Sequence, residues 1–182
     1  MAKEGDLTQM NDRAKGFSLI EVMVALVILV IGLVGIFNLH IVAKRGSFES
    51  FQQTQASYYA SDIISRMKLN RDQLPDYAGN YTGVPTIPSK ACTGAAICST
   101  SETVAWDLYE WRASFVGQAE KVGTTNVGGL DTPTGCVTIN GNNVTVVMAW
   151  KGIRPVSDAG DTGSCGTSSD RRRLFTMQTV II

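Results

Sequence analysis

The sequence predicts an α+β protein in which one long N-terminal helix packs on a small antiparallel β-sheet. The first half of this helix is expected to span a membrane, because residues 22–37 have no polar side chain. The second half is expected to be amphipathic, since apolar residues recur every three or four positions over 44–70. The sheet is expected near the C-terminal end, where apolar and polar residues alternate.

The composition suits a membrane anchor followed by one modest, loop-rich domain. The chain has 182 residues, a formal net charge of zero and 44% hydrophobic residues. Proteins that bind nucleic acid usually carry an excess of positive charge, so no nucleic-acid partner is expected. Much of the hydrophobic content falls in residues 17–43, whereas the remainder is rich in Gly, Thr, Ser and Asn.

The apolar segment 17–43 fits a transmembrane helix better than two alternatives. As a helix it would be about 40 Å long, whereas about 20 residues suffice to cross a bilayer. A buried core helix would show a polar face, which residues 22–37 lack. A secretory signal peptide has a shorter apolar core and a small-residue cleavage site after it. The flanking charges say little about orientation, but the later cysteines favour an external C-terminal side.

One carboxylate, Glu21, lies near the start of this apolar helix. A charged side chain at the bilayer centre costs roughly 2.5–3.5 kcal/mol on insertion scales, so such residues are usually paired and functional. Cleavage after Gly16 would create a cation at the new α-amino group of Phe17, one helical turn before Glu21. Spacing alone leaves open an ordinary anchor whose Glu21 lies near the membrane interface.

The junction Gly16-Phe17-Ser18-Leu19-Ile20-Glu21, continued by Val22-Met23-Val24-Ala25-Leu26, resembles the class III leader of type IV pilins and pseudopilins. This resemblance implies that a prepilin peptidase cleaves after Gly16 and methylates the amine of Phe17. It also implies that Glu21 is the assembly glutamate, which pairs with the Phe17 amine of a neighbouring subunit.

The resemblance also implies a domain organisation with a pilin fold. The expected parts are a cleaved leader (1–16), the transmembrane and assembly half of the helix (17–43), its amphipathic half (44–70) and a periplasmic head with a C-terminal antiparallel sheet (71–182). Met10 would give a leader of residues 10–16 with a basic end, so Met1 and Met10 both remain open as the start.

The head is similar, over a looser pattern, to the PilV (type IV pilus modification protein) family of minor pilins. This similarity rests on a Trp-containing helix, a Gly-rich link, a strand ending in Ala149-Trp150-Lys151-Gly152, an Arg-rich segment and the C-terminal strand that follows it. The similarity implies a minor pilin without enzymatic activity or cofactor. It would be a single-pass inner-membrane protein with a periplasmic head that joins the pilus priming complex or the extracellular fibre.

The same resemblance names the expected partners and leaves an alternative. The partners are other minor pilins and the major pilin, prepilin peptidase, the inner-membrane assembly platform and the lipid bilayer. The alternative is a minor pseudopilin of a type II secretion system. A rival of a different class is a membrane-anchored periplasmic binding or enzyme domain. The sequence leaves open a position at the tip or along the shaft, and adhesive or DNA-uptake roles.

Residue spacing predicts the elements beyond the apolar segment. In the amphipathic half, the expected buried stripe is Phe48, Phe51, Gln55/Ala56, Tyr59, Ile63 and Met67. Later elements are a loop over 71–100, a helix over 102–120 that buries Val104, Leu108, Trp111 and Phe115, a linker over 123–135, and strands at 136–139, 144–150 and 174–182.

Four cysteines, Cys92, Cys98, Cys136 and Cys165, follow the apolar segment. They form no C-x-x-C pair and the single histidine, His40, is distant in sequence, so no metal site is expected. Two disulfides in an oxidising compartment are expected instead. Three pairings are possible, and we favour Cys92–Cys98, which closes a short loop, with Cys136–Cys165.

Three other patterns occur in or next to the loop 152–172. Asp161-Thr162-Gly163 matches the core of an aspartic protease but lacks the preceding apolar strand and a second aspartate, so catalysis is not expected. Asp158, Asp161 and Asp170 could bind Ca²⁺ but do not follow EF-hand spacing. Residues 171–173, three consecutive arginines, are expected to form a solvated face.

Overall fold

The computed structural model describes residues 16–156 and 165–182. The chain divides into two compact units between Lys44 and Arg45. Apart from Gly16, the expected leader lies outside the described residues, as does the choice between Met1 and Met10 as the start.

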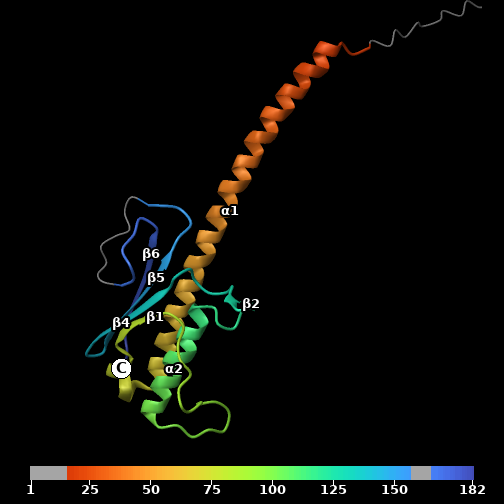
Figure 1. Ribbon diagram of the computed structural model, residues 1–182. Coiled ribbons are helices and arrows are strands. Elements are labelled where there is room, and N and C mark those ends of the chain that lie inside the picture. The colour runs from red at the N-terminus through yellow and green to blue at the C-terminus, as the bar shows by residue number, and fades with distance from the viewer. Residues whose placement is uncertain (1–15, 157–164) are drawn as a thin grey trace, which may run out of the picture. The chain divides into compact units, whose positions relative to one another are not determined.

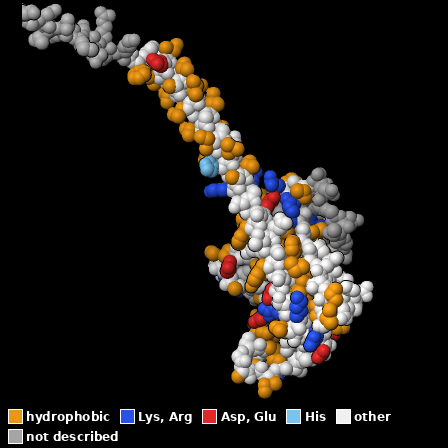
Figure 2. All heavy atoms as spheres, turned by 180° about the vertical axis from the view of Figure 1, so that it is seen from behind, with side chains coloured by type: hydrophobic (Ala, Val, Ile, Leu, Met, Phe, Trp, Pro, Cys, Tyr) orange, Lys and Arg blue, Asp and Glu red, His pale blue; other side chains and the backbone are white. Residues whose placement is uncertain are grey.

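Helix α1 (Leu19–Leu69) crosses this division (Figure 1). Its residues up to Lys44 belong to the first unit, in which every described side chain is exposed. By length and composition this is the one helix of the described chain that could cross a membrane. Figure 2 shows hydrophobic side chains over this part of the helix. α1 ends at Leu69, six residues before Pro75, a residue type that interrupts helices.

The second unit joins the later part of α1 to an antiparallel sheet, and this confirms the predicted α+β, pilin-like architecture. Its main sheet has the strand order β1-β4-β5-β6, and β2 and β3 form a separate hairpin. The elements are η1 (Arg71–Tyr77), β1 (Gly79–Thr82), α2 (Thr100–Phe115), β2 (Lys121–Val122), β3 (Thr125–Asn126), β4 (Thr134–Asn140), β5 (Asn143–Lys151) and β6 (Arg172–Val180).

Two predicted loop regions contain secondary structure. The segment 71–100 holds η1 and strand β1, and the predicted linker 123–135 overlaps the β2–β3 hairpin. β1 has four residues, GNYT, which are too few to show an alternating pattern. Its place is set by pairing with β4, where Tyr81 lies opposite Gly135. Such long-range pairing cannot be seen in a short stretch of sequence.

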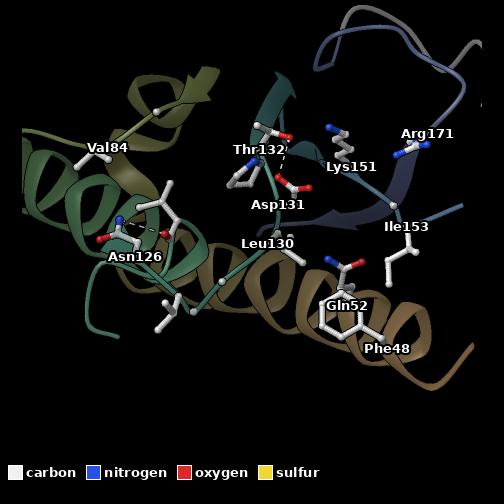
Figure 3. A pocket seen from close by; sticks show the side chains of 17 residues that line it. Phe48, Gln52, Val84, Asn126, Leu130, Asp131, Thr132, Lys151, Ile153 and Arg171 are labelled. Carbon is white, nitrogen blue, oxygen red and sulfur yellow. Dashed lines mark hydrogen bonds between the residues drawn. The ribbon is translucent and has the colours of Figure 1, made fainter. Parts of the chain in front are cut away.

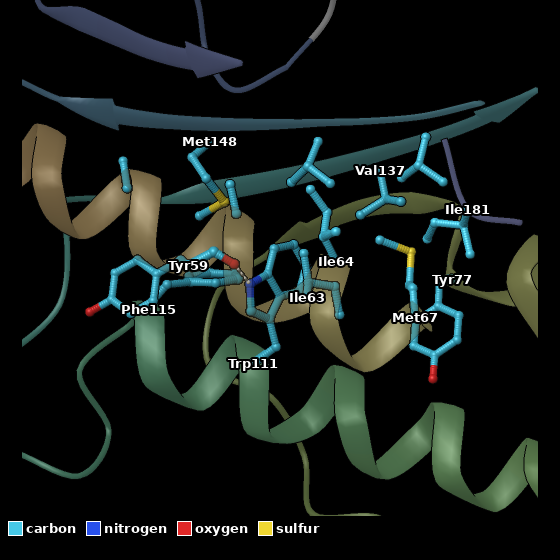
Figure 4. Packing of buried hydrophobic residues seen from close by; sticks show 14 of the residues in the cluster. Tyr59, Ile63, Ile64, Met67, Tyr77, Trp111, Phe115, Val137, Met148 and Ile181 are labelled. Carbon is cyan, nitrogen blue, oxygen red and sulfur yellow. Dashed lines mark hydrogen bonds between the residues drawn. The ribbon is translucent and has the colours of Figure 1, made fainter. Parts of the chain in front are cut away.

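The buried face of α1 is displaced from the predicted stripe. Phe48 and Phe51 are 48% and 56% exposed, so their predicted burial was wrong. Gln52 is buried in their place, because the sheet and α2 cover a face that begins one residue after Phe51. The buried residues of α1 are Gln52, Ala56, Tyr59, Ala60, Ile63, Ile64 and Met67. Figure 4 shows side chains of α1, α2 and the sheet meeting in one layer.

Trp111 lies at the centre of this layer and is fully buried. Its indole Nε1–H donates to the carbonyl oxygen of Tyr59 on α1 at 2.8 Å. Its ring makes edge-to-face contacts with Phe115 and Tyr81, at centroid distances of 5.0 and 5.7 Å. Trp111 therefore joins α2 to both α1 and β1.

Both disulfides join the cysteines that the sequence analysis favoured. The disulfide between Cys92 and Cys98, which are six positions apart, closes a short loop just before α2. Helix α2 itself begins with a capping box, in which Ser99 and Glu102 satisfy each other's backbone N–H groups. Cys136 of β4 is bonded to Cys165, so the segment that leads into β6 is fastened to the sheet.

Replacing Gly135 by alanine should destabilise the second unit. A Cβ at Gly135 would overlap the six-membered ring of Trp111, which is held by its hydrogen bond to Tyr59. Overpacking of this kind typically costs about 1–3 kcal/mol. Chemical unfolding of the full chain in detergent measures the loss.

Gly46→Ala is the matched control for this prediction. The same methyl group would meet no atom within 4 Å there. Because Gly46 lies in the interior of α1, alanine should stabilise the helix by roughly 0.5–1 kcal/mol. Equal stability of Gly135→Ala and the wild type would contradict the packing described for Trp111.

Candidate functional site

The predicted processing junction lies at the start of α1. Gly16, Phe17 and Ser18 precede the helix, and the backbone N–H groups of Glu21 and Val22 donate to the Ser18 carbonyl at 3.0 and 3.2 Å. Glu21 is therefore in the first helical turn, where a negative charge interacts favourably with the helix dipole. The peptide bond between Gly16 and Phe17, where cleavage is expected, lies outside regular secondary structure.

The surface around Glu21 is apolar. Phe17 is 83% exposed. A shallow hollow on one face of the helix is lined by Phe17, Glu21, Val22, Ala25, Leu26 and Leu29. Glu21 is the one charged residue in that lining, and no ion pair joins it to another described residue.

This arrangement can accept an apolar helix that carries a cation. The nearest titratable groups later in α1 are His40 and Lys44, and His40 is roughly 28 Å along the helix from Glu21. Neither can neutralise Glu21 within the same helix. In an apolar environment an unpaired carboxylate is costly and a paired one is tolerated. Among the described residues of the first unit, none that follows Glu21 can therefore supply its counter-charge.

Comparison with known families identifies the same junction. The family model described as the prokaryotic N-terminal methylation motif matches residues 11–37. The chain carries this motif. The match supports a type IV pilin-like or pseudopilin protein, and together with α1 it indicates a single-pass membrane anchor. Comparisons with curated proteins and with solved structures find no match.

The predicted solvated arginine face is wrong for two of its three members. Arg172 is 7% exposed and donates to the Cys165 carbonyl at 3.3 Å. Arg173 donates to Glu49 of α1 at 3.2 Å and to the Arg154 carbonyl at 2.8 Å. The strand register explains this: Arg173 lies opposite Trp150 on the face turned toward α1, and Arg172 lies on the other face beneath the Cys165 segment. Arg171 alone is exposed.

Glu49 is the acceptor in this cluster. It accepts from the backbone N–H of Arg154 at 3.2 Å and from its guanidinium at 3.1 Å. The hydrogen bond from the Arg154 side chain lowers the pKa of Glu49, against a smaller opposing effect of burial. The sequence did not reveal this pairing because Glu49 and Arg154 are far apart in the chain.

A second polar network is internal to the head. Arg66 forms ion pairs with Asp62, Asp107 and Glu110, at 3.2, 3.2 and 2.7 Å. The hydroxyl of buried Tyr77 donates to Asp107 at 2.6 Å, and burial raises its pKa, as does this bond. Each of these groups has a partner within the network, which connects α1, η1 and α2.

The head also has an open hollow that the sequence did not predict. Figure 3 shows Phe48 and Gln52 of α1 on one side, Leu130 and Asp131 on another, and Ile153 beyond them. The side-chain oxygen of Gln52 is buried there without a hydrogen-bond partner. No group of His, Cys, Asp and Glu in the described part of the chain could hold a metal. Asp158 and the Asp161-Thr162-Gly163 pattern lie outside the described residues.

The stability of the second unit should decrease at low pH through Glu49. Its folded pKa is below the ordinary value of 4.5, so its contribution is present above pH 4.5 and is lost as the pH falls through the folded value. Urea unfolding of the full chain in detergent across this range measures the effect. Glu49→Gln should remove that part of the pH dependence, whereas Glu120→Gln, at an exposed carboxylate, should keep it. An unchanged profile in Glu49→Gln would contradict the assignment.

Proposed function

We propose that this protein is a minor type IV pilin of the PilV kind, a structural subunit without catalytic activity. A prepilin peptidase would cleave it after Gly16 and methylate the Phe17 amine. The subunit would then join other minor pilins and the major pilin at the inner-membrane assembly platform, with its head in the periplasm, and enter the priming complex or the fibre.

The observation that carries this proposal is the motif match over residues 11–37. It includes both the Gly16-Phe17 junction and Glu21, which lies in the first turn of α1 and has an apolar surrounding. The exposed apolar surface of the first unit further supports assembly, since it requires either lipid or other apolar helices around it. An exposed apolar surface of this extent is rare on soluble proteins.

The physical role of Glu21 in this proposal is to set the register between subunits. The Phe17 amine of one subunit would lie against Glu21 of its neighbour, because each is costly without the other inside an apolar bundle. A single polar pair in an apolar interface selects one alignment among many that pack equally well. The pair would therefore determine the axial alignment of one subunit's helix relative to that of its neighbour.

A minor pseudopilin of a type II secretion system remains the second candidate, since the motif supports pseudopilins equally. The two functions share the processing step and the use of Glu21. They differ in the phenotype of a deletion strain, which would lose surface pili in the first case and protein secretion in the second.

Intact mass measurement tests the processing step on which both candidates depend. Protein purified from cell membranes should lack every residue up to Gly16 and should carry one added methyl group on Phe17. The same chain produced in cells without prepilin peptidase should keep its full mass. An uncleaved N-terminus in the presence of the peptidase would overturn both candidates.

A further inference from the structure

One end of the second unit combines exposed apolar side chains with exposed cations. Phe48 and Ile153 are 48 and 39% exposed. The arginines and the lysine around them are exposed as well. We call this region the α1-entry surface, and its members are Phe48, Lys151, Ile153, Arg154 and Arg171.

Two hollows show that these residues come together from distant parts of the chain. The first is lined by Phe48 of α1 together with Lys151, Ile153 and Arg171 (Figure 3). The second is lined by Gly46 and Glu49 of α1 together with Arg154. The turn that follows β5 and the start of β6 therefore lie beside the first two turns of α1 in this unit.

The charges of this surface favour an anionic partner. The carboxylate of Glu49, which would repel one, is enclosed by the guanidinium groups of Arg154 and Arg173. The Arg154 side chain is nevertheless 51% exposed. Lys151 and Arg171 have no ion pair with another described residue, although the carboxylate of Asp131 lines the same hollow.

The position of the surface along α1 points to a lipid. In the sequence, Phe48 follows Val42, the last large apolar residue of the anchor, by six residues. Aromatic and basic side chains that closely follow a membrane-spanning segment are typical of residues in contact with headgroups.

We propose that the α1-entry surface docks the head on the membrane by binding the phosphate groups of anionic phospholipids. Lys151, Arg154 and Arg171 would contact the phosphates, and Phe48 and Ile153 would enter the interface between headgroups and acyl chains. Basic residues near such a surface are attracted to the anionic headgroups, and the attraction weakens with salt. Docking would hold an unassembled subunit with its head against the bilayer and would end when the subunit leaves the membrane.

Quenching of a probe in the full-length chain tests this proposal. Ile153→Cys, labelled with an environment-sensitive fluorophore, would be placed in nanodiscs of phosphatidylcholine with or without phosphatidylglycerol. The label should be shielded from acrylamide, a neutral quencher in water, in the anionic nanodiscs only. The shielding should disappear at high salt. Inorganic phosphate added to phosphatidylcholine nanodiscs should not restore it.

Charge reversal provides the matched comparison. Lys151→Glu with Arg171→Glu should abolish the shielding, whereas Lys68→Glu with Lys121→Glu, at exposed lysines elsewhere in the head, should leave it intact. Equal quenching in the two lipid compositions would overturn the proposal, as would shielding that survives in the first double variant. Shielding by inorganic phosphate alone would show a free-anion site and would also overturn it. The test uses no assembly partner, so its outcome is independent of the pilin assignment.

Discussion

The packing of Trp111 is the interaction on which the head depends. Its indole N–H reaches the backbone of α1, its ring contacts Tyr81 of β1 and Phe115 of α2, and it needs a glycine opposite it at position 135. A buried tryptophan is stabilising only when its N–H is bonded and its large ring is closely surrounded. Both conditions are met here by residues from four different elements, so this one side chain helps to hold α2 against α1 and against β1.

The N-terminal part of the chain is governed by a different constraint. From Leu19 to Lys44 every side chain of α1 is exposed, and nearly all of them are apolar. Such a helix is stable only in lipid or among other apolar helices. Glu21 is the one acidic residue within it, and its charge limits the environments in which the helix can be placed. Membrane anchoring is thus a property of a segment that contributes no residue to the core of the head, and the processing and assembly that we propose depend on the same segment.

Much of this protein could be predicted from its sequence because the strongest signals are local. The apolar run, the Gly16-Phe17 junction, the helical spacing in α1 and α2 and the period-two strands β4 to β6 each depend on neighbours in the chain. The cysteine pairs expected from their spacing are also the pairs that the structure contains.

What the sequence did not reveal depends on contacts between distant segments. The face of α1 that becomes buried is selected by the sheet and α2, so Gln52 is buried and Phe48 is exposed. β1 forms because β4 is available to pair with it. Arg172 and Arg173 are removed from solvent by Cys165 and Glu49, which lie 7 and 124 positions away. The bonds from Arg154 and Arg173 to Glu49 also hold the end of the sheet beside α1, where the α1-entry surface lies.

The most direct test of the account is whether the charge of Glu21, and nothing else about that residue, is required for assembly. Glu21→Gln keeps the size of the side chain and removes its charge, and Val22→Ala at the next position serves as the control. The account predicts that both variants are inserted and cleaved normally, that Val22→Ala joins complexes with partner pilins, and that Glu21→Gln does not. Normal incorporation of Glu21→Gln would contradict the pairing of Glu21 with a neighbour's amine.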